Sequence, residues 1–379
     1  MTKIIEMTGA EYKAIVKVCK GIYIGSYMPL FQYVQVHPAI GGIEFRVSNG
    51  DEEVRTRVAY DHSDHDEFSG TFGIPLDVFC GMKCGVRDRV IITDSTMSAA
   101  GVSIRFNPLP ADECPDSIIW VDTTWRRYPD LRFAEVAERF ADPSHDKFKW
   151  INLYQDGEGI YAVQNAALYA VNHRPKKVVL GSIPSAAAKI MRLASDDSEY
   201  SVSENVWRIE EPCHGRGMDR IRWEFRGKLH HPTVVNIDRV LEQSTSFPAG
   251  RYELIIGQEG IRRMQEMCPQ LLKLGMPRKN GYLSGAVRIR ARNGSGLLTV
   301  EYVALDGRTV DYSMDIPMIT ASFGDFTSSY DIDHWNTCLG SIVRTGVVKF
   351  MFDSVEAAER ATIITTDVGR VLLMPYKLK

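Results

Sequence analysis

The stretch from Asp61 to Glu67, DHSDHDE, places two histidines and four acids within seven residues. Such side chains could hold a divalent cation, but their spacing matches no standard zinc or calcium site. The stretch also lies between predicted strands, where a solvated polar loop accounts for its composition. We therefore expect a loop here. A metal-dependent enzyme on a β-rich scaffold, using this cluster and His214, is kept as the alternative.

Other reactive residues form no recognisable catalytic set. Cys80 and Cys84 are one helical turn apart, without a second pair of ligands. PCHGRG, at residues 212–217, is a glycine-rich turn that does not connect a strand to a helix, so it predicts no phosphate loop. His230 and His231 lie in a connecting segment, and no nucleophile elbow, Walker or zincin motif is present. The sequence therefore predicts no catalytic residue, no metal and no cofactor.

Basic residues recur on the predicted helices. Lys13, Lys17 and Lys20 follow i, i+4, i+7 spacing on the face opposite an apolar stripe. A lysine on a single helix is usually a solvated side chain, but here every predicted helix carries at least one basic residue. We therefore expect the helices to gather on one side and face a polyanion, while the sheets carry the acids. The further cations are Lys83, Arg139, Lys189, Arg192, Arg262, Arg263 and Arg344.

The composition is that of a folded globular protein, with 44% hydrophobic and 25% charged residues. A length of 379 residues predicts two or three domains. The formal net charge of −3 argues against a uniformly basic surface, although it permits a locally basic face. Seven scattered cysteines are typical of reduced thiols, so we expect a cytoplasmic protein.

The order of predicted elements repeats three times along the chain. The apolar spacing of an amphipathic helix occurs near Tyr12, Phe133 and Ile261. A hairpin with a strong turn signal follows each helix, at Asn49-Gly50, Asp156-Gly157 and Asn293-Gly294. A second helix then begins near residues 74, 183 and 330, and each leads into a β-rich run. The three copies account for the whole chain.

The chain ends on the largely apolar stretch VLLMPYKLK, at residues 371–379. Residues 371–374 fit a buried last strand, but Pro375 stops strand pairing. Tyr376 then has no obvious core to enter. A binding pocket explains Pro375 and Tyr376 better than a core does.

Taken together, these features resemble the bacterial DNA polymerase III β subunit, the sliding clamp. Members of that family commonly end on a motif like VMPMRL, which LLMPYKL matches. RFNPLPADECPDSIIW, WEFRGKLHHPTVVNIDRVL and GAVRIRARNGSGLLTVEYVALDG match other clamp segments in the same order. Two motifs depart from the family: RVSNGDEEV stands where TDL is usual, and QNAALYA replaces TDGHRLA. Such divergence would suit a clamp encoded by a phage or mobile element.

The resemblance implies an α+β fold of three clamp domains, with helices lining an inner face and antiparallel sheets outside. The implied boundaries are 1–121, 122–250 and 251–379. It also implies a head-to-tail homodimeric ring that encircles duplex DNA and performs no reaction. An ATP-driven loader places such rings on DNA, where they tether the polymerase during replication. The matching interface residues are Ile104 and Phe106 against Leu271 and Leu272.

Clamps of this family bind short linear peptides of polymerase and loader in a hydrophobic pocket beside the C-terminal tail. Carried over by position, the tail forms one wall and the QNAALYA segment stands opposite. Three residues of the following connector close the side, and Trp150 is a further match. The implied pocket residues are Trp150, Ala166, Ala167, Leu168, Tyr169, Pro232, Arg239, Val240, Leu372, Leu373, Met374, Pro375, Tyr376 and Lys377.

Overall fold

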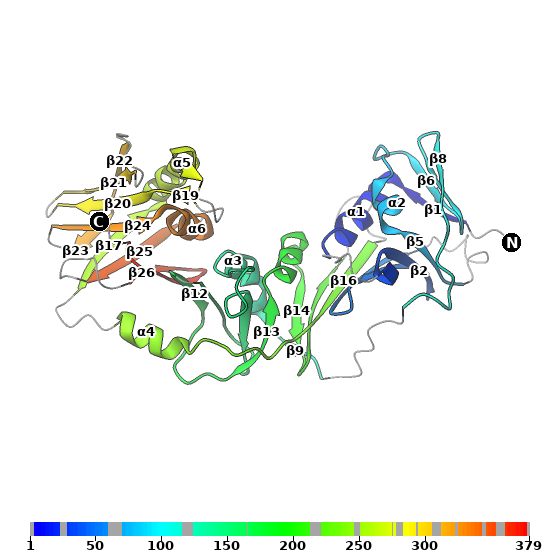
Figure 1. The fold of residues 1–379 in the computed structure, drawn as a ribbon, viewed down its shortest axis with the longest axis horizontal. Helices are drawn as coiled ribbons and strands as arrows, with labels where there is room; N and C mark the ends of the chain where they lie inside the picture. Colours follow the sequence, from blue (N-terminus) through cyan, green and yellow to red (C-terminus); the bar gives the residue numbers. More distant parts are fainter. Residues whose placement is uncertain are drawn as a thin grey trace. The chain divides into compact units, whose positions relative to one another are not determined.

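The chain folds into two compact units, each built from antiparallel sheets with helices packed on them (Figure 1). The first unit comprises Met1–Arg132 and Ala186–His231, and the second Phe133–Ser185 and Pro232–Lys379. The predicted α+β class is therefore confirmed. The computed structural model describes residues 4–22, 29–59, 70–115, 124–164, 166–212, 221–245, 251–274, 276–277, 283–292, 295–304, 312–322, 325–342, 346–353 and 361–376.

An eight-stranded sheet forms the centre of the first unit. Its strands run in the order β5-β2-β3-β4-β16-β15-β14-β9, so β4 and β16 join segments far apart in the sequence. Alternate residues such as Val54 and Phe225 are fully buried on one face. The strands are β2 (Tyr33–Ala39), β3 (Gly42–Ser48), β4 (Glu52–Ala59), β5 (Phe72–Pro75), β9 (Arg126–Arg127), β14 (Glu199–Val202), β15 (Val206–Glu211) and β16 (Ile221–Lys228).

A second, four-stranded sheet and short helices complete this unit. The sheet runs β1 (Ile5–Thr8), β6 (Arg89–Ile92), β7 (Thr96–Ala99) and β8 (Val102–Arg105), which leaves β8 at an edge. Thr8 and Glu11 form a capping box at the start of α1, and Tyr12 and Ile15 anchor its apolar face. The helices are α1 (Gly9–Cys19), α2 (Leu76–Gly81) and the 3-10 helices η1 (Pro29–Phe31), η2 (Pro129–Phe133) and η3 (Ala187–Leu193).

A nine-stranded sheet forms the centre of the second unit, in the order β13-β10-β11-β12-β27-β26-β25-β17-β23. The last strand of the chain, β27, lies inside it between β12 and β26. The strands are β10 (Trp150–Tyr154), β11 (Ile160–Gln164), β12 (Ala167–Val171), β13 (Val179–Pro184), β17 (Arg251–Gly257), β23 (Thr320–Ser322), β25 (Val347–Asp353), β26 (Thr362–Thr366) and β27 (Gly369–Leu373).

The rest of the second unit consists of two smaller sheets and four helices. In the four-stranded sheet, β22 and β24 lie at the two edges. This sheet runs β22 (Ser313–Pro317), β21 (Leu297–Val303), β20 (Ala286–Ala291) and β24 (Phe326–Asp331), and β18 (Met276–Pro277) pairs with β19 (Leu283–Ser284). The helices are α3 (Ala134–Glu138), α4 (Ile237–Thr245), α5 (Gln258–Leu274) and α6 (Ile332–Ile342).

The predicted order of elements is largely confirmed. The first helices of the three repeats are α1, α3 and α5, and the second helices are α2, η3 and α6. The middle second helix is 3-10 rather than α. The hairpins β3–β4, β10–β11 and β20–β21 all form, although the Asn293-Gly294 turn lies outside the described residues. Helix α4 was not predicted. The three domain boundaries stay a prediction.

The first hairpin turn buries a carboxyl group. Gly50 has a φ of +93°, and the Asn49 side-chain oxygen accepts hydrogen bonds from the Asp51 and Glu52 amides. The Glu52 side chain is buried beside this turn, where Asn49 donates to it at 3.1 Å. Burial raises the pKa of Glu52 from 4.5 to about 7, and only the Asn49 hydrogen bond opposes the shift.

The substitution Glu52→Gln should therefore stabilise the protein at pH 8. The unfolded chain releases this proton near pH 4.5 and the folded chain near pH 7, so the penalty for the charged form grows across that window. It reaches on the order of 3 kcal/mol above pH 7. Thermal unfolding should show a higher melting temperature for the variant at pH 8 and little difference at pH 4.

The matched control is Glu199→Gln on the exposed edge of the same sheet, which should change the melting temperature little at either pH. A Glu52→Gln protein that is less stable than the wild type at pH 8 would contradict the inference that burial destabilises the charged form of Glu52.

Candidate functional site

The three predicted lysines of α1 are all exposed, opposite the buried Tyr12 and Ile15. Among the described residues, none of the three takes part in an ion pair or a side-chain hydrogen bond. Burial raises the pKa of the Cys80 thiol, and the nearby Lys20 ammonium opposes that shift. Lys20 therefore lies beside α2. This face of α1 presents uncompensated positive charge.

Further predicted cations of the first unit lie on elements next to α1. Lys83 directly follows α2, which packs against α1, and it is exposed. The end of α1 meets η3 so closely that a Cβ on Gly21 would lie 2.4 Å from Ile190 Cδ1. Lys189 and Arg192 are exposed on η3. The predicted gathering of cations on neighbouring helices is therefore present within this unit.

The predicted cations of the second unit are compensated locally. Arg262 Nη1 is 2.6 Å from Glu266, and its Nη2 is 3.0 Å from Glu259. Arg263 Nε is also 3.0 Å from Glu259. Arg139 donates to the backbone carbonyl of Gly340 at 2.6 Å and so ties α3 to α6. Arg344 lies outside the described residues. The net positive charge on the surface of α5 is consequently smaller than the number of its arginines indicates.

Strand pairing accounts for the apolar residues of the chain's ending up to Leu373. Leu372 lies opposite Leu168 of β12 and opposite Ile363 of β26, and Leu373 lies opposite Ala167 and Thr362. Where both faces of a sheet are covered, a central strand buries successive side chains rather than alternate ones. Val371, Leu372 and Leu373 are accordingly buried.

The predicted pocket wall is divided between the two faces of this sheet. Leu168 and Leu372 join an apolar cluster with Ile237 and Leu241 of α4, and Val240 packs against it. Successive side chains of a strand point to opposite faces. Ala167, Tyr169 and Leu373 therefore face away from α4, and the Tyr169 ring stacks on Phe140 with centroids 5.3 Å apart. The structure thus brings together Leu168, Leu372 and Val240 but not the whole predicted set.

The residues beyond β27 stay near the surface. Met374 is 45% exposed and Tyr376 is 37% exposed, with the half-buried Pro375 between them. The Met374 amide donates to the Ala166 carbonyl at 2.9 Å, and the Tyr376 amide donates to the Ser329 carbonyl of β24 at 2.6 Å. The tail therefore bridges β12 and β24 and leaves apolar side chains accessible. Lys377 lies outside the described residues.

The three remaining pocket residues are less closely placed. Arg239 is exposed on α4, next to Val240 in sequence. Pro232 is half-buried in the segment that leads to α4. Trp150 is on β10, two strands away from β12, and its Nε1 donates to the Asp146 carbonyl at 2.8 Å. Trp150 is thus the predicted residue least connected to the tail.

The predicted dimer residues fall into two groups. Leu271 is fully buried and Phe106 is buried, so both belong to the core of their own unit. Leu272 is 42% exposed and Ile104 is half-exposed on the edge strand β8. Tyr312, directly before the edge strand β22, donates to Gln270 Oε1 at 2.6 Å, which places this end of α5 beside β22.

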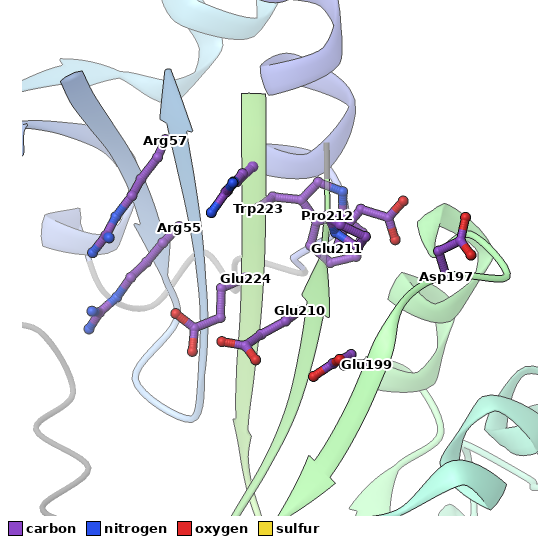
Figure 2. Close-up of a pocket in the computed structure, with 10 residues that line it drawn as sticks. Arg55, Arg57, Asp197, Glu199, Glu210, Glu211, Pro212, Trp223 and Glu224 are labelled. Carbon is purple, nitrogen blue, oxygen red and sulfur yellow. The ribbon is translucent and has the colours of Figure 1, made fainter. Parts of the chain in front are cut away.

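A pocket of about 430 Å³ in the first unit, which the sequence did not indicate, has a mixed-charge lining. Figure 2 shows Arg55 and Arg57 on β4, with Glu224, Glu210 and Glu199 on the following strands. Most of these charges are balanced by neighbours: Arg55 by Glu53, Arg57 by Glu44, Glu210 by Arg208, and Glu224 by Arg226. The other lining residues are Asp197, Glu211, Pro212, Arg222 and Trp223.

This charged pocket spans the β4–β16 junction. Three of the four ion pairs join residues two apart on one strand, and the pair of Arg57 with Glu44 links β4 to β3. The lining residues come from four separate segments of the sequence, which the register of the sheet brings together. Its described lining contains no histidine, cysteine or hydroxyl nucleophile. It is suited to stabilising the sheet face rather than to chemistry.

The remaining candidates for chemistry are limited. Within the described ranges, no group of three or more His, Cys, Asp or Glu side chains is arranged to hold a metal ion. The Asp61–Glu67 cluster and His214 lie outside those ranges, so the metal-enzyme alternative stays untested. Of the helices described, none has the length and apolar character needed to cross a membrane.

No protein-family model matches the chain, and no curated protein matches its sequence. Solved structures, in contrast, match over the full length. The sliding clamp of Bacillus subtilis gives a TM-score of 0.72 at 12% identity, with 100% of each chain covered. The Pseudomonas aeruginosa clamp, solved with griselimycin, gives 0.71 at 13%, again with 100% of each covered. The Streptococcus pyogenes β subunit gives 0.69 at 12%, with 99% of this chain and 100% of that chain covered.

The chain therefore has the sliding-clamp fold from end to end. The clamps it matches are bacterial, the β subunits of DNA polymerase III, and the resemblance drawn from the sequence is confirmed at the level of fold. With identities of 11 to 13%, it is a divergent example of that fold.

Two substitutions to aspartate, one at a buried and one at an exposed apolar residue, should separate the core of the tail from its surface. Leu372→Asp places a carboxylate in the cluster shared with α4, so we expect a loss of several kcal/mol and an unfolded or aggregated protein. Met374→Asp changes an exposed side chain beyond the last strand and should lower the free energy of unfolding by less than about 1 kcal/mol. Urea unfolding measures both. Equal destabilisation would show that the sheet continues past Leu373.

Proposed function

We propose that this protein is a DNA sliding clamp: a ring that encircles duplex DNA and tethers the replicative polymerase without catalysing a reaction. The full-length match to clamp folds at TM-scores near 0.7 is the observation that carries the proposal. A clamp needs no active site, and the charged pocket described above offers no nucleophile. Such a protein acts in the cytoplasm, where the replicating DNA and the loader are found.

Lysines on the helices of the first unit are suited to hold the duplex. Lys13, Lys17 and Lys20 have no partner among the described residues, and Lys83 and Lys189 are exposed on adjoining elements. Contacts of ammonium groups with phosphates carry no sequence information, so they permit sliding. Arg139, Arg192, Arg262, Arg263 and Arg344 complete the proposed DNA-facing set. The arginines of α5 contribute less, since glutamates already pair with them.

Ring closure would use one edge strand from each unit. We place β8 of one subunit against β22 of the next, with Ile104 and Phe106 on one side and Leu271 and Leu272 on the other. These edges differ, so the contact is head-to-tail, and two copies close it into a ring. Pairing them also removes two open sheet edges. Each ring would then contain two copies of domains 1–121, 122–250 and 251–379.

Short linear peptides of the polymerase and the loader would bind beside the tail. Leu168, Leu372 and Val240 pack in one apolar cluster that would lie beneath the bound peptide, and Met374 and Tyr376 have exposed apolar side chains that it could contact. Buried apolar anchors dominate small interfaces of this kind. The polar loop usual in the family is replaced here by Ala166, Ala167 and Leu168, so we expect a more apolar peptide or one with different spacing.

Charge reversal should distinguish the free lysines from the paired arginines. The protein is loaded onto nicked circular DNA by its loader, and the fraction retained is followed by gel filtration at rising salt. Lys13→Glu/Lys17→Glu/Lys20→Glu should lose retention at several-fold lower salt than the wild type, because phosphate contacts are lost. Arg262→Glu/Arg263→Glu should have the smaller effect.

Both variants change exposed side chains, so circular dichroism should show the wild-type fold. Linearising the DNA should release every variant and the wild type, since a ring slides off an end. Retention on linear DNA, or tight sequence-specific binding to an oligonucleotide, would contradict the proposed function.

The proposed dimer contact should be sensitive to Leu272 in particular. Leu272→Asp places a charge on an exposed residue beside β22 and should give folded monomers at micromolar concentration by light scattering. Leu271→Asp should instead unfold the protein, because that side chain is fully buried. Val178→Asp, on an exposed loop residue, serves as the control and should leave the dimer intact. A monomeric wild type would argue strongly against the ring.

A further inference from the structure

Helix α4 is held on its sheet by a hydrogen-bonded network around His173. His173 follows β12, and its Nε2 lies 3.0 Å from Asp238 Oδ1 in the first turn of α4. Its Nδ1 is hydrogen-bonded to the Tyr154 hydroxyl at the end of β10. The second Asp238 oxygen accepts from the Lys176 amide at 2.8 Å. We call Tyr154, His173 and Asp238 the His173 network.

The arrangement defines the tautomer of the neutral ring. A neutral imidazole has one donor and one acceptor nitrogen. Asp238 can only accept when ionised, so Nε2 carries the proton, and Nδ1 accepts from the Tyr154 hydroxyl. Both nitrogens of the neutral ring are thereby satisfied, and His173 connects β10, the segment after β12 and α4.

Helix α4 is short, and the apolar side that it buries is small. Isolated helices shorter than about 12 to 15 residues are marginal in water. The nine residues of α4 bury Ile237 and Leu241, with Val240 partly buried. A hydrogen bond to a charged group is stronger than one between neutral groups. The His173 network is therefore a substantial part of what fixes this helix.

The apolar side of α4 packs on the residues that form the floor of the proposed peptide pocket. Ile237 and Leu241 share one cluster with Leu168 and Leu372, and Val240 packs against it. The hydrogen bonds of Asp238 and the apolar contacts of Val240 therefore act on the same turn of α4. If Asp238 is released, α4 can shift and the Val240 side of the pocket shifts with it.

We propose that His173 is a positioning residue for the peptide pocket, which it shapes by fixing α4 through Asp238. This inference rests on the proposed function, since it concerns how that pocket is presented to a peptide. His173 itself need not touch the peptide. Its replacement should weaken peptide binding through α4 while leaving β12 and β27 paired.

The network should also make the pocket sensitive to acid. Burial lowers the pKa of His173, Asp238 opposes this shift, and Lys177 and Arg370 add to it. Lys177 is itself paired with Asp156 at 2.8 Å and lies 5.1 Å from the Tyr154 ring centre. The His173 imidazole binds a proton less readily when α4 is in place than when α4 is released, so protonation favours release of α4. The state with α4 in place is fully favoured above the ordinary pKa of histidine and is weakened as the pH falls through the lowered pKa.

Two measurements test the proposal on the full-length protein. One is hydrogen exchange of the α4 amides without peptide, and the other is fluorescence anisotropy with the C-terminal peptide of the polymerase that works with this protein. His173→Ala and Asp238→Ala should each speed exchange in α4 and weaken the peptide affinity on the order of tenfold. The double variant should be no worse than either single one, because the two residues act as a unit.

Arg174→Ala is the matched control, since Arg174 is exposed and its nearest carboxylate, of Glu158, is 3.9 Å away. It should behave like the wild type. The wild-type affinity should fall between pH 7.5 and 5.5, and that of His173→Ala should stay flat. Unchanged α4 exchange and unchanged affinity in His173→Ala would overturn the proposal. Absence of peptide binding by the wild type at every pH would instead contradict the proposed function, and the exchange result alone would then decide whether His173 fixes α4.

Discussion

Backbone hydrogen bonding between strands far apart in the sequence holds each unit together. In the first unit β4 pairs with β16, and in the second β12 pairs with β27. Each junction turns two shorter sheets into one continuous sheet, which removes four open edges from the molecule. The charged pocket on the eight-stranded sheet and the position of the tail both follow from these registers. A chain that ended before β27 would leave β12 and β26 without a shared partner.

The periodic features of the sequence were sufficient to predict most helices and hairpins, but not which distant strands pair with each other. The i, i+3, i+4, i+7 spacing around Tyr12 and Ile261 found α1 and α5, and the Asn49-Gly50 turn found the first hairpin. Helix α4 was missed because its segment was assigned as a connector by resemblance. Its spacing of Ile237, Val240 and Leu241 was nevertheless a helical signal.

The candidate site was predicted less completely than the fold, for two physical reasons. A run such as Leu372, Leu373 and Met374 appears continuous in sequence, yet a strand sends alternate side chains to opposite faces. Only the register of β27 against its neighbouring strands shows which of its two faces contacts α4. The charge of α5, in contrast, could have been judged from the sequence: Glu259 precedes Arg262 and Arg263 by three and four residues, the spacing of paired helix side chains.

The distribution of charge is uneven despite the small net charge of −3. Uncompensated lysines gather on the adjoining helices of the first unit, whereas many of the cations on the sheets and on α5 are paired with acids. A protein that must hold a polyanion weakly, and slide along it, benefits from this arrangement. Under the proposed function, a few free ammonium groups would supply affinity for DNA, and the topology of a ring would supply retention.

The most direct test of the proposed function is an electron-microscopy image of the purified full-length protein. A sliding clamp should give a closed ring of two head-to-tail subunits around a central hole wide enough for duplex DNA. Particles that are single subunits, or compact dimers without a hole, would contradict it.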